Sequence, residues 1–179
     1  MSNRSNQIVT LVSALHKGLA INLDSPVDAS AMARALGGKV IVVSDDEIEH
    51  EACIEKKGET FEIKVKDFHP PRMTFSIAHE LGHLFLHMGY MTDEKRFAAL
   101  ADGHAYDRNT TYEFGKTEEE YEANSFASEL LMPRLQFLEA VRLFSSAGSC
   151  DIPRLANRFG VSKQAAVTRG RWLGVFAWD

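Results

Sequence analysis

The chain has 179 residues and a mass of 20.0 kDa, which fits one compact domain, or a domain with a small helical appendage, better than two full domains. Its 45% hydrophobic and 25% charged residues argue against disorder, and its formal net charge of -5 argues against a protein whose whole surface binds nucleic acid. No apolar run reaches the roughly 18 residues of a membrane span. Its two cysteines, Cys53 and Cys150, lack metal-ligand spacing. We therefore expect a cytoplasmic protein with reduced thiols and no membrane contact.

The N-terminal third contains two helical signals followed by three strand signals. Gly37-Gly38 ends the second helix, and Lys56-Lys57-Gly58 is expected to form the turn of a hairpin. Phe61, Ile63 and Val65 alternate with polar residues, as a sheet with one face in water requires. The expected elements are helices over 6–20 and 28–36 and strands over 39–44, 51–55 and 60–65.

The rest of the chain is predicted to be mainly helical. Pro70-Pro71 breaks the chain before the first of these helices, Pro133 ends the second, and residues 89–115 show no sustained period. The expected helices span 74–88, 118–131, 134–144, 152–159 and 162–173. The predicted fold class is α+β, with a small antiparallel sheet packed on a helical core that ends in C-terminal helices.

The motif His79-Glu80-Leu81-Gly82-His83 lies within the helix expected over 74–88. Four residues along a helix turn about 400°, so the two imidazoles lie about 40° apart, one turn above the other, where one tetrahedral metal accepts both. Glu80, roughly 100° from His79, reaches a water molecule beside the metal without being a ligand. Two neutral imidazoles, one more ligand and an open position make a catalytic zinc site, and the carboxylate serves as general base. The alternative is a helix with two unrelated histidines.

A third ligand must come from elsewhere, and the helix expected over 118–131 offers one. Glu119 and Glu120 lie about 40° and 60° from Ala123 on its buried stripe, so either can face the first helix, whereas Glu122, about 100° away, is expected to face solvent. An acidic first turn favoured by the helix dipole is the alternative for the whole run. Three residues of the unassigned stretch compete as ligands: Asp102, His104 and Asp107.

Two segments, RMTFSIAHELGHLFLH over 72–87 and EYEANSFASELLMP over 120–133, resemble the ImmA/IrrE family of metallopeptidases. In the first, Arg72 and Phe75 precede the AHELGH core, and Leu86-His87 follows it. The second matches the pattern E-x-x-A-N-x-F-A-x-x-L-L-M-P. The resemblance covers roughly residues 28–173, with both motifs in the family's order.

The resemblance implies a zincin-like core, similar to the thermolysin-like or gluzincin arrangement. It implies that Glu80 is the catalytic base. Asn124 takes the place of a residue that orients a ligating histidine, and His87 is a second candidate for that role. The implied ligands of Zn2+ are His79, His83 and Glu120.

The separation of the two motifs is longer than in the shortest relatives, so residues 89–115 are expected to form an insertion, such as a lid or a loop that contacts substrate. Aromatic packing is the alternative role for its tyrosines. The candidate oxyanion donors or substrate contacts are Tyr90, His104, Tyr106 and Tyr112. We expect an N-terminal helix and turn over 1–27, followed by the metallopeptidase domain over 28–179.

Residues 151–173 have the outline of a helix-turn-helix, because a turn with Gly160 and an N-cap at Ser162 join two short helices. Between 153 and 172 the charged residues are all basic: Arg154, Arg158, Lys163, Arg169 and Arg171. Direct DNA contact is therefore one interpretation. The other is a helical pair that closes the peptidase core with a solvated basic face, and the similar ending inside the peptidase domain of related family members favours it.

The sequence thus predicts a zinc-dependent endopeptidase. The resemblance implies that it cleaves or inactivates a helix-turn-helix transcriptional repressor and so relieves repression of a stress or mobile-element operon. The rival hypothesis is a DNA- or repressor-binding regulatory module whose metal site is not catalytic.

Overall fold

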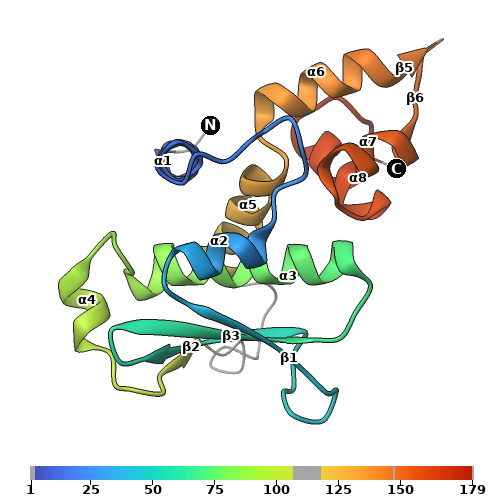
Figure 1. Ribbon diagram of the computed structural model, residues 1–179. Helices are drawn as coiled ribbons and strands as arrows, with labels where there is room; N and C mark the ends of the chain where they lie inside the picture. Colours follow the sequence, from blue (N-terminus) through green and yellow to red (C-terminus); the bar gives the residue numbers. More distant parts are fainter. Residues whose placement is uncertain (1–2, 107–117, 147, 179) are drawn as a thin grey trace.

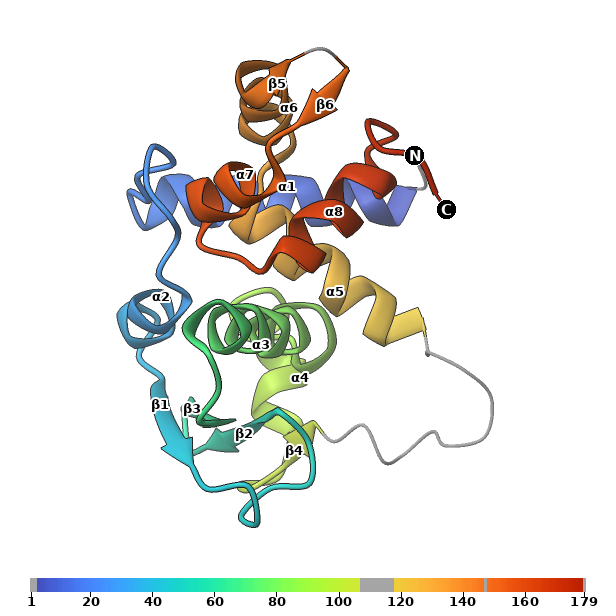
Figure 2. The same ribbon diagram turned by 90° about the vertical axis from the view of Figure 1, so that its right-hand side faces the viewer.

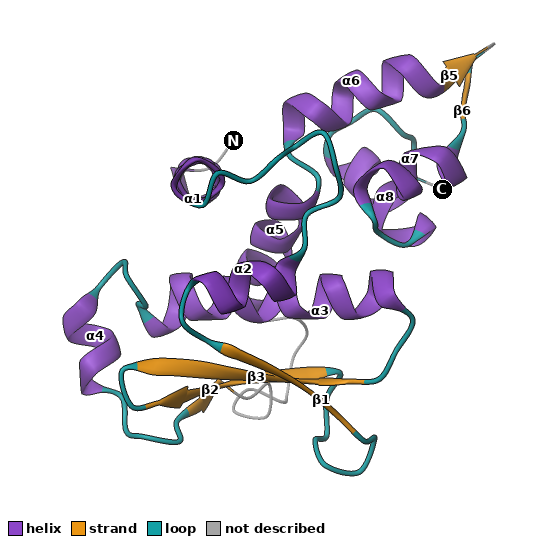
Figure 3. Cartoon of the chain, viewed as in Figure 1, coloured by secondary structure: helices purple, strands orange, loops and turns teal. Residues whose placement is uncertain are grey.

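A four-stranded sheet forms one layer of the fold, and most helices lie on one side of it (Figures 1 and 3). The computed structural model describes residues 3–106, 118–146 and 148–178. The strand order is β1-β3-β2-β4. The strands are β1 (Lys39–Val43), β2 (Ala52–Lys57), β3 (Thr60–Lys66) and β4 (Ala105–Tyr106). The predicted α+β class is confirmed.

The sheet is mixed rather than wholly antiparallel. β2 and β3 form the expected hairpin, and β4 adds to the other edge of β2. β1, however, pairs with β3 in parallel, with Val40 opposite Ile63. The purely antiparallel sheet predicted from the sequence is therefore wrong in this detail, because alternation of polar and apolar residues fixes which face of a strand is buried and not its direction. The alternating Phe61, Ile63 and Val65 side chains are buried as expected.

Helix α3 (Pro70–His83) lies on the sheet and continues without a break into the π-helical turn η1 (Leu84–Met88). It begins four residues before the expected start at Thr74. Pro70 and Pro71 occupy the first turn, where the missing N–H groups need no partner and the fixed φ suits a helix. The two prolines therefore start this helix. Gly89, with φ of 84°, ends η1.

Helix α5 (Glu118–Leu131) crosses close to α3 (Figure 2). A Cβ atom on Gly82 would lie 2.9 Å from the Cα atom of Ala123, so only glycine lets the two helices approach this closely. Helix α1 (Asn3–Gly18) packs on α5, and the Nε2 atom of His16 donates to the carbonyl oxygen of Leu130 at 3.0 Å. The N-terminal helix is therefore in direct contact with the helix that carries the predicted third ligand.

The remaining elements complete the helical side. In Figure 2, α1, α7 and α8 form an upper layer, with α3 between them and the sheet. Gly160 ends α7 with φ of 63°, and the Ser162 hydroxyl accepts from the Ala165 amide at 3.1 Å, so the predicted helix-turn-helix outline is confirmed. The remaining elements of the fold are α2 (Ala29–Ala35), α4 (Glu94–Ala99), α6 (Arg134–Phe144), the hairpin of β5 (Ser145–Ser146) and β6 (Ser149–Cys150), α7 (Ile152–Phe159) and α8 (Lys163–Trp172).

Helix α4 and strand β4 lie within the stretch 89–115, which the sequence left unassigned. Asp107 and Tyr112 fall outside the described residues. Within the described ranges, no helix has the length and apolar character needed to cross a membrane.

Candidate metal centre

Three side chains from α3 and α5 bring one ligand atom each to a common point. The Nε2 atoms of His79 and His83 lie 3.0 Å apart. Glu120 places one carboxylate oxygen 3.4 Å from the first of these nitrogens and the other oxygen 3.2 Å from the second. Among the described residues, this is the one cluster of three or more His, Cys, Asp or Glu side chains arranged to hold a metal ion.

The donor set fits a tetrahedral zinc ion. Zinc binds imidazole nitrogen and carboxylate oxygen at about 2.0–2.2 Å, which separates neighbouring ligand atoms by about 3.3–3.6 Å in a tetrahedron. One ligand atom from each of the three side chains, two imidazole nitrogens and one carboxylate oxygen, lies within 4.8 Å of the other two, close enough to surround a single ion. Two nitrogens and one oxygen from protein leave one tetrahedral position for another group, which is the composition of a catalytic zinc site.

The charge states of the three groups also suit a cation. His79 and His83 are only 2% and 1% exposed. Burial lowers the pKa of His83 to about 4, so this imidazole is neutral near pH 7 and keeps a lone pair. Burial alone would raise the pKa of Glu120, but the close contacts with His79 and His83 outweigh it and hold the pKa below its usual range. The cluster therefore combines two imidazoles and one carboxylate anion.

Each histidine of the pair has a hydrogen-bond partner at its other ring nitrogen. The Nδ1 atom of His79 donates to the side-chain oxygen of Asn124 at 3.1 Å, since that oxygen only accepts. The Nδ1 atom of His83 lies 2.9 Å from the Nδ1 atom of His87. The sequence predicts Asn124 and His87 as orienting groups. Each of them contacts the Nδ1 atom of a histidine whose Nε2 atom faces the cluster.

Glu80 lies directly after His79 in the most buried part of α3 and is 3% exposed. Of the two glutamates that the sequence left open as ligands at the start of α5, Glu119 is exposed, whereas Glu120 lies with the two histidines. The expectation that Glu122 faces solvent is wrong, since its side chain is only 13% exposed.

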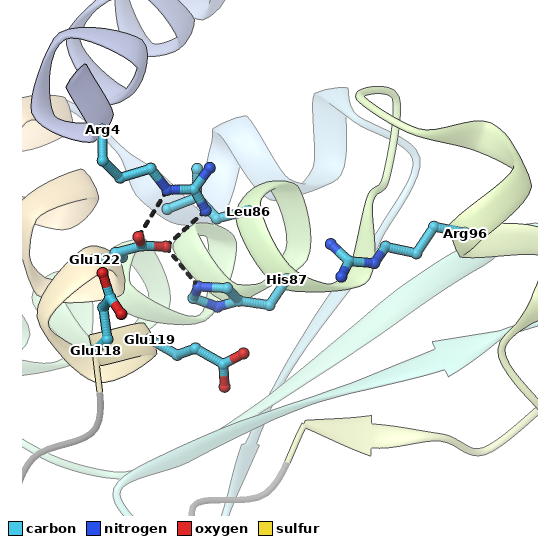
Figure 4. Close-up of a pocket in the computed structure, with 7 residues that line it drawn as sticks. All are labelled: Arg4, Leu86, His87, Arg96, Glu118, Glu119 and Glu122. Atoms are coloured by element: carbon cyan, nitrogen blue, oxygen red, sulfur yellow. Dashed lines mark hydrogen bonds and ion pairs between the residues drawn. The ribbon is translucent and has the colours of Figure 1, made fainter.

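Glu122 is in fact held from two sides. Its carboxylate accepts from the Arg4 guanidinium at 2.6 and 2.7 Å and from the Nε2 atom of His87 at 3.1 Å. The helical wheel of α5 contains no signal for this, because Arg4 is 118 residues away in the sequence. A pocket of about 370 Å³ adjoins these groups (Figure 4). It is lined by Arg4, Leu86, His87, Arg96, Glu118, Glu119 and Glu122.

The other predicted site residues that the structure describes do not join the cluster. The Tyr90 hydroxyl donates to the Leu36 carbonyl at 2.7 Å, and its ring packs edge-on against Phe61 and Phe97, so it is an aromatic core residue instead of an oxyanion donor. His104 is exposed, in the turn before β4.

Asp102 and Tyr106, the other two candidates within the described ranges, are also not part of the cluster. Asp102 accepts from the Gly58 amide at 2.7 Å and so holds the β2–β3 turn. Tyr106 pairs with Ile54 through its backbone, and its side chain lies outside the described residues.

The basic residues of the C-terminal helices are largely used within the molecule. Arg169 is buried, pairs with Glu129 of α5 and donates to the Met132 carbonyl at 3.1 Å. Arg158 donates to the Leu23 carbonyl at 2.9 Å. These contacts attach α7 and α8 to the rest of the fold, as expected of a helical pair that closes the core.

Comparison with known protein families gives a match over much of the chain. The family model of peptidase M78, described as the IrrE N-terminal-like domain, matches residues 63–170, which is more than half of the chain. The matched range contains both α3 and α5 and therefore every residue of the cluster. No curated protein was found with significant similarity to the chain.

Proposed function

Because the chain belongs to the M78 family of IrrE-like metallopeptidases, we propose that it is a zinc-dependent endopeptidase. In this proposal the zinc ligands are His79, His83 and Glu120, and Glu80 is the general base. The observation that carries it is the convergence of three ligand atoms from two helices within 4.8 Å of one another.

The chemistry follows from what each side chain offers. When bound, zinc would polarise the scissile carbonyl and lower the pKa of water to about 7. Glu80, next to His79 on α3, accepts the proton of the attacking water and passes it to the leaving amine. Asn124 holds His79 with its Nε2 lone pair toward the cluster, so that ring does not have to reorient.

The substrate that we propose is a helix-turn-helix transcriptional repressor in the cytoplasm. The resemblance of both motifs to the ImmA/IrrE family supports this choice, and a protein substrate is what a peptidase requires. Cleavage or inactivation of the repressor would then relieve repression of its operon.

The central test is the variant Glu80→Gln, which removes the base but keeps the size of the side chain. We expect it to fold and bind one zinc ion per chain, yet to cleave neither a purified helix-turn-helix repressor nor a fluorescein-labelled unfolded protein. Metal analysis and electrophoresis of the digests measure the two properties. Cleavage by the variant at the wild-type rate would remove Glu80 from the mechanism.

Two further variants test the ligand set. Glu120→Ala should lose stoichiometric zinc, whereas Glu119→Gln, an exposed position in the same helical turn, should retain it. The DNA-binding alternative makes the opposite prediction. It requires binding to operator DNA with a steep dependence on salt, which Glu80→Gln and Glu120→Ala would leave intact.

A further inference from the structure

Glu122 lies at the centre of a set of charge-assisted hydrogen bonds with Arg4 and His87 (Figure 4). This set lies just outside the proposed metal centre, because His87 contacts His83. Two nitrogens of the Arg4 guanidinium donate to its two carboxylate oxygens, which is the paired geometry that arginine forms with carboxylates. On the other side, the Nε2 atom of His87 donates to one of the same oxygens. The carboxylate thus fixes the ring of His87 and is itself fixed by helix α1.

These bonds determine how the next ring is protonated. A carboxylate only accepts, so a neutral His87 carries its proton on Nε2 and presents a lone pair at Nδ1. That lone pair lies 2.9 Å from the Nδ1 atom of His83, which must therefore be the donor. His83 is left with a lone pair on Nε2, the atom that lies beside His79 and Glu120. We call Arg4, Glu122, His87 and His83 the histidine relay.

The relay begins outside the part of the chain that matches the peptidase family. Arg4 lies on α1, whereas the match covers residues 63–170. Helix α1 packs along α5, and the Arg4–Glu122 ion pair lies at this contact. The N-terminal helix therefore reaches a proposed zinc ligand through two intervening side chains.

We propose that Glu122 and Arg4 are positioning residues for the metal centre, which hold His83 in the tautomer and orientation that zinc requires. This inference rests on the proposed zinc site. Outer hydrogen-bond partners of metal-binding histidines raise metal affinity by roughly 10- to 100-fold, and a carboxylate behind the ring is a frequent partner. Glu122 acts here through one additional imidazole, and Arg4 holds the carboxylate in place through its paired hydrogen bonds.

The test measures zinc affinity by competition with a chromophoric chelator. We expect Glu122→Gln to weaken zinc binding by roughly 10-fold and Arg4→Gln to weaken it less. The matched control is Lys57→Gln, which removes a surface ion pair with Glu55 whose cation is 44% exposed, as Arg4 is. The control should bind zinc as the wild type does.

A spectroscopic measurement separates positioning from general stability. Long-range 1H–15N NMR spectra of the zinc-loaded wild type should show His83 protonated on Nδ1 and His87 protonated on Nε2. In Glu122→Gln we expect the His87 signals to lose this single tautomer, while circular dichroism shows an intact fold. If that variant does not fold, the exposed Arg4→Gln variant carries the same test.

The outcomes distinguish the two proposals. A folded wild type that binds no zinc would overturn the proposed function itself. A wild type that binds zinc, together with relay variants of unchanged affinity and unchanged tautomers, would overturn the relay alone. Weakened binding in Glu122→Gln but not in Arg4→Gln would confine the positioning role to Glu122.

Discussion

At the scale of single residues, Asn124 offers the most direct test of how the centre is preorganised. Its side-chain oxygen accepts from the Nδ1 atom of His79, on the side of the ring opposite to the cluster. Replacing Asn124 by Ala leaves that N–H without this partner and the ring without this restraint. We expect zinc affinity to fall by roughly 10-fold, as measured by chelator competition.

The neighbouring Ser125 supplies the control for this variant, because it is exposed on the same helix. Ser125→Ala should bind zinc as tightly as the wild type. Equal affinity of the Asn124 and Ser125 variants would show that the amide does not orient the ring.

The residues of the centre differ in how far the sequence predicts them. Helical spacing over one turn predicts that His79, Glu80 and His83 belong to one site, and their burial on α3 agrees with that prediction. Glu120 could be separated from Glu119 only through the family resemblance. The contact of Glu122 with Arg4 was missed, because the helical wheel of α5 describes one helix and the partner comes from α1.

At the scale of secondary-structure elements, the approach of α3 to α5 sets the geometry of the centre. Gly82 lies between the two histidines of α3, against the backbone of Ala123. Replacing it by Ala puts a methyl group 2.9 Å from a backbone atom, so the helices must separate. We expect a loss of about 1–3 kcal/mol in the free energy of unfolding, together with weaker zinc binding because Glu120 moves with α5.

The control is Gly18→Ala at the end of α1, where an added Cβ atom meets no other atom within 4 Å. Urea unfolding of the zinc-free variants gives the stability, and chelator competition gives the affinity. A Gly82→Ala variant with wild-type values in both measurements would contradict the role assigned to this close contact.

The C-terminal helices are attached to α5 by a buried ion pair, and this too is a property of elements. Replacing Arg169 by Met leaves Glu129 buried beside an apolar side chain, which we expect to cost about 3–5 kcal/mol in the free energy of unfolding. The double variant Arg169→Met, Glu129→Leu also removes the buried carboxylate that lost its arginine, so it should recover most of the lost free energy of unfolding. Chemical denaturation measures both variants, and equal losses would mean that the unpaired carboxylate is not the cause.

The element boundaries show where local sequence rules suffice. The helices expected over 118–131, 134–144 and 152–159 are confirmed, since caps and prolines mark their ends. The predicted start of α3 at Thr74 is too late, because Pro70 and Pro71 fit the first turn of a helix as well as they interrupt one. The parallel pairing of β1 with β3 depends on how the chain returns to the sheet, which no pattern within a strand encodes.

At the scale of the whole molecule, buried histidines make the stability depend on pH. His16 of α1 is buried against α5, and burial lowers its pKa below the ordinary value of 6.5, although the Leu130 carbonyl opposes the shift. The folded state therefore binds this proton less readily than the unfolded state. Its contribution to stability is complete above about pH 6.5 and is lost as the pH falls from there toward the lowered pKa.

We therefore expect the free energy of unfolding of the zinc-free protein to fall between pH 7.5 and pH 5.5. Replacing His16 by Gln should make this fall smaller, because Gln does not bind a proton in this range. His83 and His87 have pKa values lowered in the same direction, so part of the fall should remain. Urea titrations at the two pH values measure the difference, with the exposed His104→Gln variant as control. If His16→Gln falls as steeply as the wild type, the docking of α1 on α5 does not depend on a neutral His16, and the pH dependence must come from the histidines of α3 and η1.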